Sequence, residues 1–225
     1  INYDFKDIFG KGSNHKLNLL AGHEYVYTSQ NDITNEVHGF PAGFDSEAAW
    51  KLSAAGKYNF TVDDNYRAND KLLSYFGRAN YSFMEKYLLS ATFRADASSK
   101  FAAGNRWGYF PSVAAAWRIS SEKFMEGTQD WMDDLKLRVS FGTAGNNGIP
   151  TGQLVQTYNN SSTTWVNGLT GYVAPSKVMA NPNLKWETTI TRNIGLDFSF
   201  LGGKISGTAE VYYNSTKDLL LSFPV

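Results

Sequence analysis

Residues 73–94, LSYFGRANYSFMEKYLLSATFR, alternate apolar and polar side chains with a period of two. The odd positions of 73–81 and 87–93 carry Leu, Tyr, Gly, Ala and Phe, whereas Ser, Arg, Asn and Thr fill most of the positions between them. In an extended chain this period sends successive side chains to opposite faces of a strand. The stretch therefore predicts two antiparallel strands joined by a tight turn at 83–86.

The same alternation recurs on both sides of this hairpin. It appears at 113–119, 135–142, 186–200 and 205–213, and more weakly at Ile1–Phe9 and Lys16–Thr28. The pair Gly202-Gly203 separates the last two strands and marks a turn. We predict an all-β, antiparallel chain of about eight strands with almost no helix.

The connections between the predicted strands differ in length at the two ends. The short side has Gly10–Asn14, Phe83–Lys86, Leu201–Lys204 and the longer Ser120–Asp133, with a helical turn around Glu122–Met125; the long side has Ser29–Asp70, Ala97–Trp107 and Thr143–Asn183. Short turns on one side and long loops on the other are typical of outer-membrane β-barrels, whose long loops face the cell exterior. A soluble sandwich seldom needs two such long loops on one side.

Each predicted strand has one aliphatic face with aromatic rings near its ends. These rings are Tyr75, Tyr81, Tyr87, Phe93, Trp117, Phe141, Trp186, Phe200 and Tyr213. In a membrane barrel they form girdles at the lipid–water boundaries, and the opposite face lines the lumen. The alternation predicts a lumen-facing set and a lipid-facing set: Arg94, Arg118, Lys136 and Arg138 in the lumen, and Leu89, Val113, Leu137 and Leu196 toward lipid. The alternative is a soluble two-sheet protein whose apolar face covers a core.

Arg192 is the exception on the lipid-facing side, because it lies between Ile190 and Ile194. An arginine costs roughly 2–4 kcal/mol at the bilayer midplane but only about 0–1 kcal/mol near an interface. Phe200 adjoins the short turn, and counting back about nine residues, the length of a spanning strand, reaches the outer boundary. We therefore predict that Arg192 lies at the outer headgroup level and that Trp186 lies beyond it.

The composition excludes several other classes of protein. The chain has 225 residues, no cysteine, and 21 basic against 21 acidic residues. Without cysteine there is no disulfide scaffold, no Cys-ligated zinc and no cysteine nucleophile. A net charge of zero gives no electrostatic reason for a nucleic-acid partner. Because both ends fall in or next to strand-like segments, we expect a piece of a larger barrel rather than a closed one.

No constellation of catalytic or metal-binding residues stands out in the sequence. The candidates are His15, His23, His38 and the acidic group Asp63, Asp64, Asn65 and Asp70. The histidines lack the spacing of a zinc helix, and the acidic group lacks the glycine and terminal glutamate of a calcium loop. The nucleophile-elbow, P-loop and dinucleotide motifs are missing. We predict no enzyme activity, no metal and no cofactor, and a structural role for Asn105–Gly108.

The long segment Thr143–Asn183 holds the residues best suited to a ligand. Its rings Tyr158, Trp165 and Tyr172 stand among Asn, Ser, Thr and Gln side chains. Flat rings stack on the C–H faces of sugars, while amides and hydroxyls bond their hydroxyl groups. The sequence therefore makes these three rings candidate substrate-binding residues, and the alternative is that they pack the loop against the barrel or a partner.

Four strings of the sequence together resemble one known family. They are YLLSATFRADASSKF (Tyr87–Phe101), NRWGYFPSVAAAWRIS (Asn105–Ser120), LKLRVSFGTAGNN (Leu135–Asn147) and NPNLKWETT (Asn181–Thr189). In this order they resemble the SusC/RagA family of TonB-dependent outer-membrane transporters of the Bacteroidetes. The resemblance implies a 22-stranded barrel, of which this chain carries part, with a plug domain and a TonB box that are absent from this chain.

The resemblance also implies a function and partners. It predicts active import of glycans or peptides across the cell outer membrane, with outer-membrane lipid, TonB, a SusD-like lid lipoprotein and an oligosaccharide or peptide substrate as partners. Two alternatives stay open at this point. One is a siderophore or cobalamin receptor of the same architecture, and the other is a soluble β-rich carbohydrate-binding module.

Overall fold

A computed structural model describes most of the chain. The described residues are 1–5, 10, 13–37, 60–66, 69–156, 158–161, 172–175 and 179–221, and in 31–37, 60–66, 159–161 and 172–175 the description covers the backbone alone.

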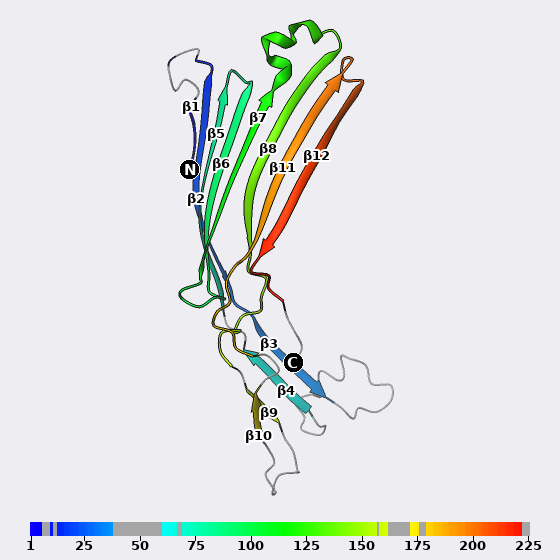
Figure 1. Ribbon diagram of the computed structural model, residues 1–225. Helices are drawn as coiled ribbons and strands as arrows, with labels where there is room; N and C mark the ends of the chain where they lie inside the picture. Colours follow the sequence, from blue (N-terminus) through cyan, green and yellow to red (C-terminus); the bar gives the residue numbers. More distant parts are fainter. Residues whose placement is uncertain are drawn as a thin grey trace.

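Eight strands form one antiparallel sheet in which each strand pairs with its neighbours in the order β1-β2-β5-β6-β7-β8-β11-β12. These strands are β1 (Asn2–Phe5), β2 (His15–Thr28), β5 (Asp70–Phe83), β6 (Tyr87–Ser98), β7 (Trp107–Arg118), β8 (Met132–Asn146), β11 (Glu187–Phe200) and β12 (Ile205–Lys217). Figure 1 shows them side by side in a single tall layer, with β1 and β12 at opposite margins. The predicted all-β fold of about eight antiparallel strands is confirmed.

The two ends of the sheet differ as predicted (Figure 1). At one end lie the tight turns after β5 and β11 and a segment with two 3₁₀ helices, η1 (Ile119–Ser121) and η2 (Lys123–Thr128), where a helical turn was expected. We call this the short-turn end. At the opposite, long-loop end lie the connections after β2, β6 and β8. Within the described residues, no helix is long and apolar enough to cross a bilayer.

Two segments predicted as loops contain further strands. Within 29–70, β3 (Asn31–Val37) pairs with β4 (Phe60–Tyr66), and within 143–183, β9 (Tyr158–Ser161) pairs with β10 (Tyr172–Pro175). The predicted long connections therefore contain strands that the sequence analysis does not assign. Each pair forms a two-stranded sheet separate from the main sheet.

Register divides the sheet into an apolar face and a polar face. On one face Val113 lies beside Phe141, and Leu137 beside Leu196. On the other face Lys136 lies opposite Asp197. The four cations and the four aliphatic residues lie on opposite faces, as the alternation predicts. Their placement in a lumen and toward lipid stays a prediction.

The main sheet has a single layer. The main contacts between its strands run between neighbours, and the described residues place no second sheet over the apolar face. Rings and aliphatic side chains on that face stay exposed, among them Tyr75 at 52% and Phe93 at 51%. A soluble two-sheet sandwich would bury this face against a partner sheet, so that alternative is wrong for this chain.

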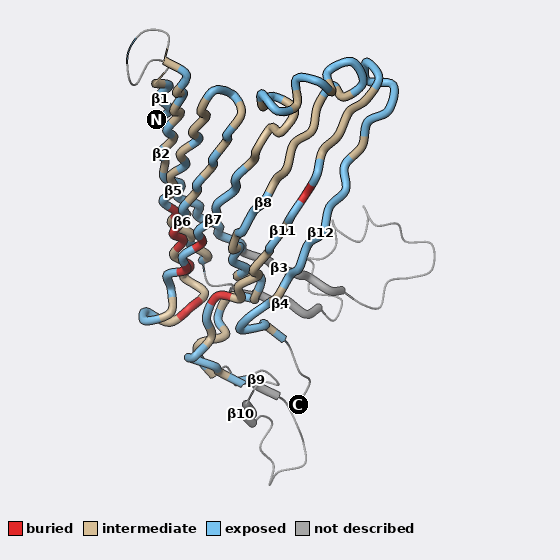
Figure 2. The backbone as a smooth tube through the Cα atoms, turned by 45° about the horizontal axis from the view of Figure 1, so that its top comes forward, coloured by how far each residue is buried: buried red, intermediate tan, exposed pale blue. Residues whose placement is uncertain are grey.

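The one buried core of the described chain lies at the long-loop end, where buried residues gather near the ends of β5 and β6 (Figure 2). Phe101, Phe110 and Trp186 are 0%, 6% and 8% exposed. The Trp186 ring lies 5.5 Å from Phe101 and 5.4 Å from Phe110, centroid to centroid, and its Nε1 donates to the Arg106 carbonyl at 2.7 Å. The prediction of Trp186 as a girdle residue is therefore wrong: it lies at the expected end of the sheet but is buried within the protein.

The loop that precedes β7 is built to close over this core. A β-carbon at Gly108 would lie 2.4 Å from the Phe110 ring and 2.9 Å from Trp186, so only glycine allows these rings to approach the backbone. Trp107 stacks on Tyr75 and Tyr109 at 6.3 and 6.5 Å on the apolar face. The structural role predicted for Asn105–Gly108 agrees with these contacts.

Candidate functional site

The polar face of the sheet is concave. One hollow of about 620 Å³ is lined by residues from β1 through to β11, among them Asp4, Asn18, Ser90, Arg138 and Asn193. This hollow reaches across seven strands, whereas two hollows on the apolar face reach across five and four, and the widest hollow of a curved sheet is expected on its inner side. The concave face is therefore the polar one, and the apolar face is convex.

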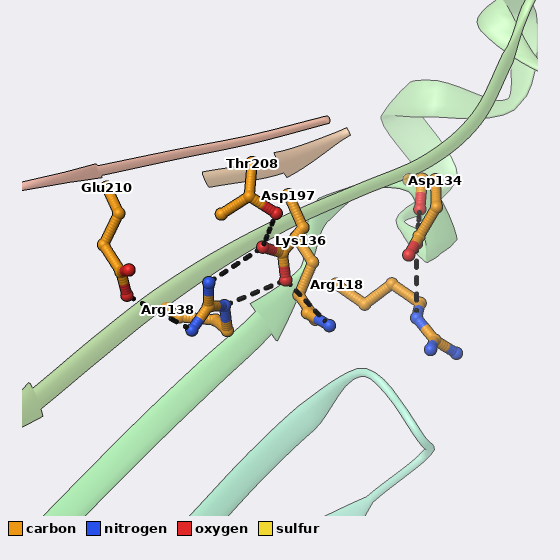
Figure 3. A network of polar contacts seen from close by, with 8 residues as sticks. Arg118, Asp134, Lys136, Arg138, Asp197, Thr208 and Glu210 are labelled. Carbon is orange, nitrogen blue, oxygen red and sulfur yellow. Dashed lines mark hydrogen bonds and ion pairs between the residues drawn. The ribbon is translucent and has the colours of Figure 1, made fainter. Parts of the chain in front are cut away.

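A carboxylate on β11, near the short-turn end of the concave face, holds two cations (Figure 3). Asp197 accepts a bidentate pair of hydrogen bonds from Arg138, with Nε and Nη2 each 2.9 Å from a carboxylate oxygen. Lys136 Nζ lies 2.9 Å from the same carboxylate, and Thr208 donates to it at 3.0 Å. Bidentate arginine–carboxylate pairs are among the strongest hydrogen bonds in proteins, so this group ties β8, β11 and β12 together.

The network extends to both sides of Asp197. Glu210 lies 3.8 Å from Arg138 Nη1 and accepts from Asn193 Nδ2 at 2.6 Å. Toward the short-turn end Arg118 Nε lies 3.4 Å from Asp134, which also accepts from Ser120 at 3.0 Å. Positive and negative side chains therefore alternate along this wall instead of forming a field of one sign.

A second cluster of polar residues lies at the long-loop end of the concave face. Arg94 Nε donates to both oxygens of Asp96 at 2.8 and 2.9 Å, and Nη2 reaches Ser74 at 2.9 Å and Glu24 at 3.2 Å. Ser74 and Asp96 are only 0% and 6% exposed. A buried carboxylate needs such a partner, so Arg94 neutralises the wall beside the buried core.

These clusters contain functional residues that the sequence reasoning did not single out. The cations Arg94, Lys136 and Arg138 were assigned to the lumen, but their acceptors Asp96 and Asp197 were not paired with them. The alternation along each strand was enough to place Asp96 and Asp197 on the polar face. Which cation each carboxylate meets depends on the register between strands, and the alternation within one strand does not predict that register.

At the short-turn end Glu122 fastens the 3₁₀ segment to the sheet. Its Oε1 accepts from the Tyr87 hydroxyl at 2.7 Å and from Trp117 Nε1 at 3.1 Å, and its Oε2 lies 3.2 Å from Lys86 Nζ. The hydrogen bond from Tyr87, then those from Trp117 and Lys86, lower the pKa of Glu122 below its usual value, against a smaller opposing effect of burial. The charged carboxylate is therefore the form that holds this segment.

This arrangement predicts a pH-dependent attachment. A carboxylate whose pKa is lower in the folded state stabilises the fold above its unfolded pKa, and the contribution disappears as the pH falls through the folded value. We expect the amide protection factors of 119–128, measured by hydrogen exchange, to fall as the pH drops below about 4.5, the usual value for a glutamate. Glu122→Gln should show, at every pH, the reduced protection that the wild type shows only at low pH.

The matched control is Glu126→Gln, because Glu126 is an exposed residue of η2, the 3₁₀ helix that Glu122 precedes. It should keep the wild-type profile. A Glu122→Gln variant that loses protection at low pH as the wild type does would contradict the assignment of the transition to Glu122.

The three predicted substrate-binding rings are not brought together by the described residues. Tyr158 opens β9 and is 61% exposed, whereas Tyr172 opens β10 and pairs with Ser161 at the other end of the ribbon. The side chain of Tyr172 and the whole of Trp165 lie outside the described residues. The assignment of Tyr158, Trp165 and Tyr172 to substrate binding stays a prediction.

The histidine and acidic candidates lie in different parts of the chain. His15 Nδ1 lies 2.6 Å from the Tyr81 hydroxyl, His23 packs beside Tyr75 at 6.3 Å, and His38 lies outside the described residues. Asp70 pairs with Lys100 at 3.3 Å, whereas Asp63, Asp64 and Asn65 belong to β4. Across the described ranges, no three His, Asp or Glu side chains are grouped so as to hold a metal.

The sequence matches one protein family over almost its full length. The match covers residues 2–225 and the family is described as "TonB dependent receptor-like, beta-barrel". The chain belongs to this family of TonB-dependent receptor β-barrels. Membership agrees with the two-faced antiparallel sheet and its unequal ends.

Two curated TonB-dependent receptors illustrate the relationship. The barrel segment is 37% identical over 195 residues to the TonB-dependent receptor SusC of Bacteroides thetaiotaomicron, covering 84% of this chain and 19% of that receptor. It is 34% identical over 218 residues to the TonB-dependent receptor P26 of Formosa agariphila, covering 95% of this chain and 21% of that receptor. The chain thus spans about one fifth of the length of these relatives.

A solved structure gives the same result for the fold. The TonB-dependent receptor segment superposes on a chain of the RagAB peptide transporter with a TM-score of 0.81 and 27% identity, covering all of this chain and 24% of the other. A second structure of this importer, in its open-open state, gives a TM-score of 0.76. The predicted SusC/RagA resemblance is confirmed.

The four strings that carry the resemblance meet in the buried core of this receptor segment. Phe101 closes the first string, Phe110 lies in the second and Trp186 in the fourth. The third string contributes Asn147, whose amide donates to Ser98 at 3.1 Å and whose carbonyl accepts from Lys100 at 3.4 Å. The shared strings therefore mark a structural closure at the long-loop end rather than a set of catalytic residues.

Proposed function

We propose that this chain is part of the wall of an outer-membrane β-barrel through which a TonB-dependent transporter imports glycans or peptides. In this proposal residues 1–225 form part of the barrel domain, and the plug domain and TonB box lie elsewhere in the receptor. In this proposal the protein acts as a transporter rather than an enzyme, because its relatives are TonB-dependent receptors and a peptide transporter. Its described residues build a wall with paired charges, which suits that role.

The observation that carries this proposal is the contrast between the two faces of one curved sheet. The convex face exposes Leu89 at 45%, Val139 at 43% and Phe141 at 41%, which in water would favour aggregation. The concave face carries ion pairs and amides around an open hollow. Lipid outside and water inside satisfy both faces at once.

The wall has a passive part in the proposed mechanism. Its hydrogen-bonded strands form a rigid surface, and its arginines and lysines are matched by carboxylates such as Asp96 and Asp197. A lumen wall with balanced charges does not trap a neutral or zwitterionic polar cargo by long-range attraction. This suits oligosaccharides or peptides passing through water, while gating and energy coupling belong to the plug and TonB.

The relatives favour glycan or peptide import over siderophore or cobalamin uptake. They include SusC itself and the RagAB peptide transporter. By the same resemblance the partners are TonB, a SusD-like lid lipoprotein over the long-loop end, and outer-membrane lipid. Uptake of labelled oligosaccharides and of labelled peptides by cells with and without the receptor gene tests this choice, and loss of siderophore uptake alone would overturn it.

The membrane placement predicts opposite environments for neighbouring residues. Leu137 lies on the convex face beside Leu196, and Arg138 lies on the concave face with Asp197. We expect a spin label at Leu137→Cys in the intact receptor in liposomes to be relaxed by lipid-soluble oxygen. A label at Arg138→Cys should respond to a water-soluble nickel complex.

The absence of cysteine from this chain makes these labels specific within it. Val139→Cys repeats the convex environment two residues further on and serves as the control for register. Water access at both Leu137 and Val139, or lipid access at Arg138, would overturn the proposed placement.

A further inference from the structure

Arg192 is a cation on the convex, apolar face. It pairs with Phe141 on one side and Tyr213 on the other, with Ile194 next on the same face, so its predicted face is confirmed without a bulge at this position. The sheet irregularity in this strand lies between Ser199 and Phe200. Unlike Arg94 and Arg138, Arg192 has no carboxylate partner among the described residues.

The surroundings hold the guanidinium in a fixed place. Its central carbon lies 5.9 Å from the Phe141 ring centroid and 5.6 Å from that of Tyr213. Nη1 donates to the Ser215 hydroxyl at 3.4 Å. Two rings that flank an arginine orient it through cation–π contact and leave its remaining N–H groups directed at whatever lies outside the sheet.

Counting along the strands places Arg192 at the level of an aromatic row. Three strands, β5, β7 and β11, carry an aromatic ring at or next to their short-turn end, namely Phe83, Trp117 and Phe200. Eight residues before these rings stand Tyr75, Tyr109 and Arg192, respectively. Tyr75 and Tyr109 belong to the stacked, exposed rings of the long-loop half. Arg192 is thus at the level where those rings mark one boundary of the apolar band.

An apolar groove crosses four strands of the convex face beside Arg192. Two rows of side chains line it, and the second row is two residues nearer the short-turn end: Val113, Phe141, Arg192 and Tyr213 form the first, and Ala115, Val139, Ile194 and Val211 the second. The groove holds about 520 Å³. It offers a polar, positively charged end and an otherwise aliphatic floor.

We propose that this groove binds one lipid with an anionic phosphate headgroup, the phosphate on Arg192 and Ser215 and an acyl chain along Ala115, Val139 and Ile194. Arginine matches phosphate because its planar guanidinium donates two parallel hydrogen bonds. The charge of the guanidinium suits the phosphate of such a lipid, and the aliphatic row of the groove suits its acyl chain. The inference rests on the proposed membrane placement of the convex face.

The test uses the intact receptor in detergent and native mass spectrometry of added lipid. We expect dimyristoylphosphatidylglycerol to bind and Arg192→Gln to weaken it about tenfold, the loss of one charge-assisted hydrogen bond. Ala115→Phe, which fills the groove but leaves the cation, should weaken binding as well. Arg78→Gln, a cation on the concave face that contacts Thr92, is the control and should bind like the wild type.

Three outcomes would overturn the lipid site. They are phosphatidylglycerol binding unchanged by Arg192→Gln, equal loss with Arg78→Gln, and displacement by inorganic phosphate alone, which would indicate a phosphate site without a lipid. A fluorophore at Arg192→Cys, read with depth-dependent quenchers in liposomes, separates this failure from that of the proposed function. Headgroup-level quenching supports the site, quenching at the bilayer centre overturns its placement, and absence of lipid quenching overturns the membrane placement itself.

Discussion

Replacing Phe101 with alanine should lower the free energy of unfolding of the barrel by about 3–5 kcal/mol, the range for a fully buried phenylalanine. Phe101 is 0% exposed and packs against Trp186 and Phe110. Its removal leaves a cavity beneath the loop that joins β6 to β7, where neighbouring rings are held by the backbone and cannot collapse inward. Urea titration of the intact receptor in detergent, compared at constant slope, measures the loss.

Phe124→Ala is the matched control for this prediction. Phe124 lies in η2 and is 69% exposed, so the same change should cost less than about 1 kcal/mol. A loss at Phe101 no greater than the loss at Phe124 would mean that the cluster does not stabilise the long-loop end of the sheet.

The second large effect concerns the concave network. Asp197→Asn should destabilise the barrel by about 1.5–3 kcal/mol, the range for hydrogen bonds to charged groups. The change removes the shared anion of Arg138 and Lys136, which lie beside each other on the same wall. The two cations then lose their shared anion, and only Glu210, 3.8 Å from Arg138, remains beside them. The midpoint of urea unfolding again reports the loss.

A double-mutant cycle isolates the interaction from the loss of a single charge. Arg138→Gln should cost less in the Asp197→Asn background than in the wild type, since its partner is already gone. Glu210→Gln is the control, because Glu210 is 41% exposed and 3.8 Å from Arg138, and it should cost about 0–1 kcal/mol. Additive losses for Asp197 and Arg138 would contradict a coupled network.

The two predictions concern two groups of residues with different structural roles in the sheet. The buried rings close the long-loop end, where three long connections leave the sheet, and the ion pairs hold neighbouring strands together across the lumen wall. Neither group includes the aliphatic side chains of the convex face, which stay exposed and, in the proposed function, contact lipid. This division explains how a sheet of one layer, with little buried core of its own, forms part of a barrel wall.

The sequence alone determined the eight strands of the main sheet and their faces, because a period of two depends only on local backbone geometry. Leu137 and Arg138 had to lie on opposite faces, and Arg192 had to share a face with Ile194, whatever the partners of the strand. The difference between short turns and long loops was equally local. These two patterns were enough to predict the barrel wall and its lumen side.

Only the tertiary structure decided which residues meet across strands. Trp186 follows the same alternation as the girdle rings, yet it is buried with Phe101 and Phe110 because the loop after β6 folds back over the sheet end. The pairing of Asp197 with Arg138 likewise depends on the register of β8 against β11. Register and loop closure arise from contacts between residues far apart in the chain, and no local period encodes them.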